Sequence, residues 1–307
     1  MKNLVLLKNI ILAFFISNLL LSCSDDQKII NNIPLVPNAT TVGSGFFEFI
    51  NNDKKLNIYY HIPQNAAKNA SIVMVFHGAG RNAKDYRNAI IEKANAYNFI
   101  VITPEFSETN YPGGDGYNLG NVFIDGDNPS LNTINPENEW AFSGVENLFN
   151  FTKNEIGNTS KTYHIIGHSA GAQFAQRLIM FKPDNAYNKV IISAGGWYTV
   201  PNFTIDFPYG FEKSPLENIN LTNLFSKSVF IQVGELDNNS NDSSLRRNQF
   251  TDAQGTNRFQ RAYHFYNKSK DLAALNSIPY QWKIQTNKGL GHDFRAALEK
   301  AADIIFK

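Results

Sequence analysis

The sequence of 307 residues predicts an α/β protein, built on a mostly parallel β-sheet with helices on both faces. Short apolar runs of strand length alternate along the chain with segments in which apolar residues recur at helical spacing. Several runs are apolar throughout, which is typical of strands that are covered on both faces. In the middle of the chain one such run leads directly through Gly-His-Ser-Ala-Gly into a helical pattern. The length is sufficient for one large domain of this class.

The first element differs from the others. Residues 46–61 alternate apolar and polar side chains around a polar centre, Asn51 to Lys54, and predict an antiparallel hairpin. The buried strands that follow are expected at 71–76, 99–104, 163–166, 190–194, 228–233 and 280–286. The helices are expected at 86–97, from 140 onward, at 174–181, at 257–275 and at 294–305.

Two long segments, 105–139 and 197–226, show neither the alternation of a strand nor the apolar spacing of a helix. The first is polar and glycine-rich, and the second is rich in aromatic residues. Connections of this length are seldom passive. We therefore expect both segments to be insertions that cover a functional site and take part in binding.

The N-terminus is expected to be an export signal, residues 1–22. Lys2 and Lys8 precede an apolar stretch, 10–21, that is too short and too interrupted to span a membrane. The stretch ends at Cys23, the only cysteine of the chain. The ending Leu-Leu-Ser-Cys resembles a bacterial lipoprotein signal, in which the cysteine is acylated and becomes the mature N-terminus. The alternative is a secreted protein with an incidental cysteine.

Residues 23–42 contain Pro and Asn without a clear period, and they predict a flexible tether to a folded domain at 43–307. The start of the tether, Ser24-Asp25-Asp26, resembles the export signals of surface-exposed lipoproteins of Bacteroidota. We therefore expect the protein to be anchored to the outer membrane or cell surface by a lipid on Cys23.

The charge balance argues against nucleic acid as a partner. The chain has 28 basic and 27 acidic residues, a formal net charge of +1, and the charges are spread along the sequence. Binding to a phosphate backbone needs a basic stripe or patch, and none is visible.

The serine of the Gly-His-Ser-Ala-Gly stretch is the candidate nucleophile. Ser169 stands between a strand and a helix, flanked by Gly167 and Gly171. A serine in such a sharp turn is strained, and its neighbours must be small for strand and helix to approach each other. The free N–H groups of the helix N-terminus then point toward the serine.

A serine hydroxyl needs a base within hydrogen-bond reach, and the base needs an orienting acid. Because the carboxyl ends of parallel strands meet at one edge of a sheet, residues directly after strands converge there. Ser169, Asp237 and His292 each follow an apolar strand, in the order Ser, Asp, His. Asp242 and Asp252 compete with Asp237, but both lie in a polar loop and are expected to be solvated.

The other five histidines are expected to have structural roles, in the hairpin, within a strand, beside the serine or on a helix. They are His61, His77, His164, His168 and His264.

The second half of an anion site is expected directly after the strand at 71–76. The sequence there is His77-Gly78-Ala79-Gly80. Backbone N–H groups approach a developing oxyanion closely only where side chains are small or absent. We expect the N–H groups of Ala79 and Ala170 to form the oxyanion hole.

Together the H-G-A-G loop, the G-H-S-A-G turn, the G-E-L-D stretch at 234–237 and the G-L-G-H-D-F stretch at 289–294 resemble an α/β-hydrolase, from about residue 43 to 307. The first two motifs are similar to those of secreted esterases of the feruloyl-esterase and polyhydroxybutyrate-depolymerase-like group. That resemblance implies a serine ester hydrolase with Ser169 as nucleophile, His292 as base and Asp237 as its partner. Relatives in the group often carry Cys or Thr after the H-G pair, or use disulfides, whereas this chain has Ala79 and a single cysteine.

The expected substrate is a small or polymeric ester: aromatic, carbohydrate-linked or a polyester. Trp197 and Tyr198 follow the strand next to the serine and are expected to line the substrate pocket, with Tyr117 as a further candidate. The reaction needs neither a metal nor an organic cofactor. Asp125-Gly126-Asp127-Asn128 is similar to the start of a calcium loop but lacks the remaining ligands.

Two other functions stay open. A serine peptidase of the prolyl-oligopeptidase type shares the triad order, although such enzymes usually carry a large additional domain. A non-catalytic, lipid-anchored binding protein could also retain the fold, although such relatives generally lose a triad member.

Overall fold

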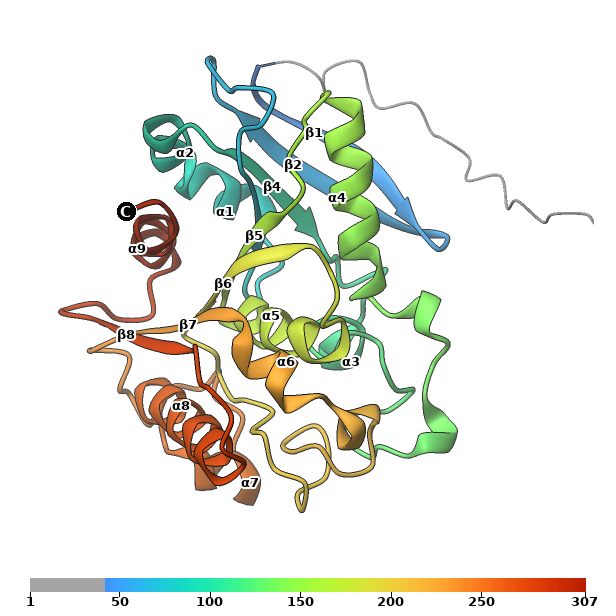
Figure 1. Ribbon diagram of the computed structural model, residues 1–307, viewed down its shortest axis with the longest axis vertical. Coiled ribbons are helices and arrows are strands. Elements are labelled where there is room, and N and C mark those ends of the chain that lie inside the picture. Colours follow the sequence, from blue (N-terminus) through green and yellow to red (C-terminus); the bar gives the residue numbers. More distant parts are fainter. Residues whose placement is uncertain (1–41) are drawn as a thin grey trace, which may run out of the picture. The chain divides into compact units, whose positions relative to one another are not determined.

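The computed structural model describes residues 42–307 (Figure 1). Eight strands form one sheet in the order β1-β2-β4-β3-β5-β6-β7-β8. Their bounds are β1 Gly43–Asn51, β2 Lys54–Ile62, β3 Ile72–Phe76, β4 Ile100–Glu105, β5 Tyr163–His168, β6 Tyr187–Ser193, β7 Ser228–Gly234 and β8 Lys283–Asn287. The β1–β2 and β2–β4 pairs are antiparallel, and the pairs from β4 to β8 are parallel. The predicted hairpin and mostly parallel sheet are confirmed.

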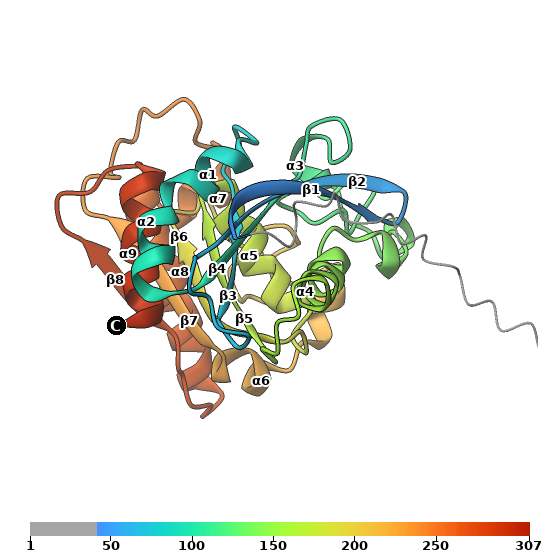
Figure 2. The ribbon, with the colours of Figure 1, turned by 90° about the horizontal axis from the view of Figure 1, so that it is seen from above.

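Helices cover both faces of the sheet, as Figure 2 shows for α1, α2 and α9 on one side and α4 and α5 on the other. The longer helices are α1 Ala83–Ala89, α2 Ile91–Tyr97, α4 Ser143–Glu155, α5 Ala170–Phe181, α8 Arg258–Leu275 and α9 Phe294–Phe306. The predicted helix at 86–97 is two helices, because the backbone of Ile90 is not helical (φ −110°, ψ 0°). Ile90 is nevertheless fully buried, so the break preserves the predicted apolar face.

Each face of the sheet has its own apolar core. In β5, Ile165 enters the core under α4 and α5, while Ile166 enters the core under α1, α2 and α9. The same alternation holds for Ile192 and Ile191 in β6. Because successive side chains of a strand point to opposite faces, two covered faces require apolar residues at every position.

The two long segments contain only short helical turns. Segment 105–139 holds α3 (Gly113–Gly116) and two 3₁₀ turns, and segment 197–226 holds a 3₁₀ turn at Pro215–Asn218 and α6 (Leu221–Ser226). The segments contact each other, because the rings of Phe123 and Phe207 lie 5.2 Å apart. A further short helix, α7 (Gln249–Gln254), precedes α8 and was not predicted.

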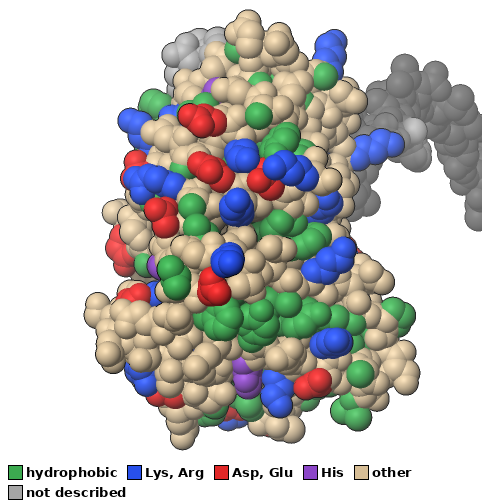
Figure 3. Space-filling model, turned by 90° about the vertical axis from the view of Figure 1, so that its left-hand side faces the viewer, with side chains coloured by type: hydrophobic (Ala, Val, Ile, Leu, Met, Phe, Trp, Pro, Cys, Tyr) green, Lys and Arg blue, Asp and Glu red, His purple; other side chains and the backbone are tan. Residues whose placement is uncertain are grey.

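On the side of the domain where α2, α9 and β8 lie, the surface carries charges of both signs and a band of apolar side chains (Figure 3). Within residues 42–307 no helix combines the length and the apolar character needed to cross a bilayer. The predicted signal 1–22, Cys23 and all but the last residue of the predicted tether lie outside the described residues.

Candidate active site

Ser169 occupies the sharp turn between β5 and α5. Its backbone is in a strained, positive-φ conformation (φ 57°, ψ −116°), which few residues other than glycine adopt. A Cβ on Gly171 would strike the carbonyl groups of Phe76 and His77, and one on Gly167 would strike the carbonyl of Gly171. The two glycines are therefore needed because the backbones of β3, β5 and α5 touch at this turn.

Three side chains from three strand ends form one hydrogen-bonded chain. His292 Nε2 lies 3.1 Å from Ser169 Oγ, and His292 Nδ1 lies 2.7 Å from Asp237 Oδ2. Asp237 follows β7 and is 4% exposed, whereas the side chain of His292, which follows β8, is 27% exposed. The arrangement has the geometry of a nucleophile, a base and an orienting acid.

A buried arginine that no local sequence pattern indicates contacts Asp237. Arg258, the first residue of α8, is 2% exposed, and its Nη1 lies 3.5 Å from Asp237 Oδ1 and 2.6 Å from Asp242 Oδ2. Its Nη2 donates to Ser244 at 2.6 Å. Hydrogen bonds from Ser244 and Arg258 lower the pKa of Asp242 well below its usual range. Asp242 is therefore an ion-pair partner of Arg258 and not the purely solvated residue that we expected.

The H-G-A-G loop lies against the serine. A Cβ on Gly78 would stand 3.6 Å from Ser169 Cβ. His77 holds this loop: its Nδ1 donates to Gly78 O at 2.9 Å, and its Nε2 accepts from the N–H of Phe106 at 3.1 Å. Burial lowers the pKa of His77 to about 4, so the ring is neutral near pH 7 and can accept that bond. The structural role expected for His77 agrees with these contacts.

The two expected oxyanion donors are the next residues in the chain after Gly78 and Ser169. Ala79 follows Gly78 in the loop, and Ala170 is the first residue of α5. The N–H of a first helical residue has no partner within the helix and is free to bind an anion.

His168 packs directly behind the base. Its ring centroid lies 4.7 Å from that of His292, and its Nδ1 lies 3.0 Å from the hydroxyl of Tyr86. Tyr86 stacks in turn on Phe294, two residues after His292, with ring centroids 4.3 Å apart. Burial holds the pKa of His168 well below its usual range, so this ring adds no charge beside the base.

Two of the three expected pocket residues do not line an open pocket. Tyr117 is 1% exposed, and its hydroxyl donates to His77 O at 2.7 Å, so it supports the H-G-A-G loop instead. Tyr198 is fully buried and stacks on Phe265 in the core. Both are corrections to the sequence prediction, and both arise because aromatic residues in irregular segments supply apolar core as well as binding surface.

Trp197, the third expected pocket residue, packs against α5. Its indole and backbone N–H groups lie 3.0 and 3.1 Å from the amide of Gln173, one helical turn after Ser169. The guanidinium groups of Arg177 and Arg246 lie 4.3 and 5.0 Å from the centre of the Trp197 ring. Trp197 is 4% exposed, so it too offers little open surface to a substrate.

The stretch at 125–128 is a closed turn. Asp125 accepts hydrogen bonds from the backbone of Asp127 and from both the backbone and the side chain of Asn128. Within residues 42–307 no three His, Cys, Asp or Glu side chains are grouped so as to hold a metal ion.

No protein-family model matches the chain, and no curated protein matches it. Solved structures do match. Poly(aspartic acid) hydrolase-1 from Sphingomonas sp. KT-1 is 30% identical with a TM-score of 0.82, covering 87% of this chain and 100% of that one. The chain belongs to the α/β-hydrolase superfamily.

Two further structures agree. The poly(3-hydroxybutyrate) depolymerase LpqC from Bordetella parapertussis is 26% identical to this α/β-hydrolase, with a TM-score of 0.78 and coverage of 87% of this chain and 90% of that one. The siderophore hydrolase EstB from Aspergillus nidulans shares the fold, at 13% identity and a TM-score of 0.53, over 86% of this chain and 95% of that one. The hydrolase activity of the superfamily therefore extends to this chain.

Proposed function

We propose that this α/β-hydrolase is a serine carboxylic-ester hydrolase that acts through an acyl-enzyme intermediate. The hydrogen-bonded chain from Ser169 through His292 to Asp237 carries the proposal. The close approach of Gly78 to Ser169 supports the proposed anion-binding loop.

In the proposed reaction His292 Nε2 takes the proton of Ser169 as its Oγ attacks the ester carbonyl. Asp237 holds the Nδ1–H of the imidazole and stabilises the imidazolium. The N–H groups of Ala79 and Ala170 bind the oxyanion, a contribution of about 3–4 kcal/mol for one such donor. The alcohol leaves with the proton from His292. Water then attacks the acyl-enzyme by the same steps and releases the acid.

A polymeric or aromatic ester is the substrate class that we favour. Poly(3-hydroxybutyrate), the polymer for which LpqC is named, is a polyester, and this supports the polymeric choice.

The first experiment uses protein of residues 24–307, which contains the whole described unit, with short-chain p-nitrophenyl esters. Ser169→Ala should lower kcat by about 10⁴-fold or more, because removal of the nucleophile abolishes the acyl-enzyme route. Ser226→Ala, which removes an exposed hydroxyl on α6, is the matched control and should leave turnover unchanged. Turnover that survives Ser169→Ala would contradict the proposed mechanism.

A second candidate function is cleavage of amide bonds in an acidic polymer. The match to a poly(aspartic acid) hydrolase at 30% identity favours it, since that polymer is amide-linked. It also keeps open the peptidase alternative. Size-exclusion chromatography of poly(aspartic acid) incubated with the protein distinguishes the two functions. Shortening of the polymer without turnover of any ester would favour amide hydrolysis over ester hydrolysis. A folded protein that cleaves neither and does not react with a fluorophosphonate would be the non-catalytic binding protein.

We also propose that a lipid on Cys23 anchors the catalytic domain to the outer membrane or cell surface. The sequence Leu-Leu-Ser-Cys and its position before the tether support this proposal. Cys23→Ser in the full chain should move the protein from the membrane fraction to the soluble fraction and abolish incorporation of labelled palmitate. Retention in the membrane fraction without label would contradict it.

A further inference from the structure

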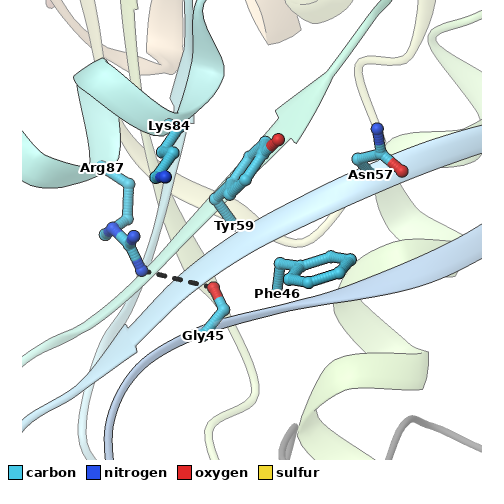
Figure 4. A pocket seen from close by; sticks show the side chains of 6 residues that line it. All are labelled: Gly45, Phe46, Asn57, Tyr59, Lys84 and Arg87. Carbon is cyan, nitrogen blue, oxygen red and sulfur yellow. Dashed lines mark hydrogen bonds between the residues drawn. The ribbon is translucent and has the colours of Figure 1, made fainter.

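A hollow of about 290 Å³ lies on the outer face of the β1–β2 hairpin, beside α1 (Figure 4). Phe46 and Tyr59 face each other across the two strands, and their ring centroids are 6.2 Å apart. Phe46 is 51% exposed, so its ring is accessible to a ligand. The two rings give the hollow an apolar floor.

The charged groups that line the hollow are both cations and both come from α1. Lys84 is exposed, and Arg87 is only 6% exposed. Arg87 Nη1 donates to the carbonyls of Gly45 and Tyr60, at 3.2 and 2.6 Å, and these bonds hold its guanidinium beside the hairpin. Within residues 42–307 neither Lys84 nor Arg87 has a carboxylate within ion-pair distance.

Two acids lie near the hollow, and the charge of Glu105 adds to burial in raising the pKa of Tyr59. Glu105 accepts a hydrogen bond from Asn57 at 2.7 Å, and Glu48 forms an ion pair with Lys55. Neither acid lines the hollow. A buried guanidinium without a counter-ion is costly, and an anionic ligand would supply the missing charge through charge-assisted hydrogen bonds.

We propose that this hollow binds an aromatic monocarboxylate, with its ring on Phe46 and Tyr59 and its carboxylate toward Lys84 and Arg87. The volume is at the lower limit for ligand sites and suits a molecule with one ring. The aromatic floor selects the ring, and the two cations select the acid.

The hollow is separate from the candidate active site. Helix α1 lies between them: Tyr86 contacts His168 behind the base, whereas Arg87, the next residue, contacts the hairpin. Hydrolysis of an aromatic ester would release an acid of the same class, so the hollow could hold a product of the proposed reaction. Its own test does not depend on turnover.

The test is calorimetric titration of the protein of residues 24–307 with 4-hydroxybenzoate. We expect saturable binding of one molecule with a Kd below about 1 mM. Benzyl alcohol, which has the ring without the acid, and acetate, which has the acid without the ring, should each bind at least ten-fold more weakly.

Variants of exposed residues assign the binding to the hollow without threatening the fold. Lys84→Gln should weaken binding about three- to ten-fold and Lys84→Glu more than ten-fold, while Phe46→Ala should weaken it at least five-fold. The matched controls are Lys161→Gln and Lys161→Glu, at an exposed lysine before β5, and Leu275→Ala, at a leucine that is 82% exposed. All three should bind as the wild type does.

The proposal is overturned if no saturable binding occurs below about 1 mM. It is also overturned if Phe46→Ala and Lys84→Glu bind as tightly as the controls, since the ligand would then sit elsewhere. If benzyl alcohol binds as tightly as 4-hydroxybenzoate, Lys84 and Arg87 do not recognise the carboxylate.

Discussion

Removal of the Arg258 side chain should destabilise the fold and weaken the candidate triad together. Arg258→Gln leaves Asp237, 4% exposed, and Asp242, whose side chain is 26% exposed, without their shared cation. Breaking a buried ion pair by removing one partner costs about 3–5 kcal/mol. Because Asp242 can take up water, we expect the lower end, about 3 kcal/mol, which corresponds to a fall in Tm of about 6–12 °C in a protein of this size.

The pH dependence of this loss follows from Asp242. Its pKa is lowered in the folded protein, so the stabilisation it provides is fully present above its unfolded value of 3.8 and is lost as pH falls through the lower folded value. Urea unfolding followed by tryptophan fluorescence should therefore give a constant difference between wild type and Arg258→Gln from pH 7 to about pH 4. The difference should narrow progressively below pH 4.

Arg258→Lys separates the charge from the geometry. A lysine keeps the cation but cannot donate to Asp242 and Ser244 through a planar fork, so it should restore only part of the stability. We expect kcat on p-nitrophenyl esters to fall about ten-fold in Arg258→Gln and less in Arg258→Lys, because His292 still holds Asp237. A loss of stability below about 1 kcal/mol in Arg258→Gln at pH 7, or one that does not change with pH, would refute the reasoning.

Three further predictions concern the residues around Ser169. Asp237→Asn should lower kcat by roughly 10⁴-fold with the fold intact, because the amide cannot hold the His292 tautomer; a fall of less than ten-fold would exclude Asp237 as the orienting acid. Tyr117→Phe removes the bond to His77 O, so it should lower kcat about ten-fold with little change in KM and cost about 1–3 kcal/mol in urea unfolding; an unchanged kcat would show that the loop needs no such support. Gly171→Ala should destabilise by at least about 1–3 kcal/mol, since its Cβ would meet the carbonyls of Phe76 and His77; a stable, active variant would mean that the turn can open.

The sheet and the three side chains of the hydrogen-bonded chain could be predicted from sequence for the same reason. β5 and β7 are buried, largely apolar strands, and Ser169 and Asp237 follow them closely. β8 is an edge strand with mostly polar residues, so His292 is identified by its place after a strand and after the acid in chain order. Local pattern therefore marks both the element and the residue that it carries.

No local sequence pattern marks the residues that support the candidate site. Arg258 begins a helix, and its partner Asp242 lies in a polar loop 16 residues earlier, so only the tertiary structure brings them together. Tyr117 lies in a segment without a period, where nothing local distinguishes a buried aromatic from an exposed one. The helix break at Ile90 was likewise invisible, because Ile90 keeps the apolar position that a continuous helix would give it.

The contacts of the candidate site are remote in sequence. The bond between Ser169 and His292 joins residues 123 apart, and that between His292 and Asp237 joins residues 55 apart. The ion pair between Asp127 and Arg246, which ties the first long segment to the loop before α7, spans 119 residues. Contacts between distant residues close large loops and form slowly. During refolding, turnover should therefore return after helical structure does, and it would report the moment at which β8 joins the sheet.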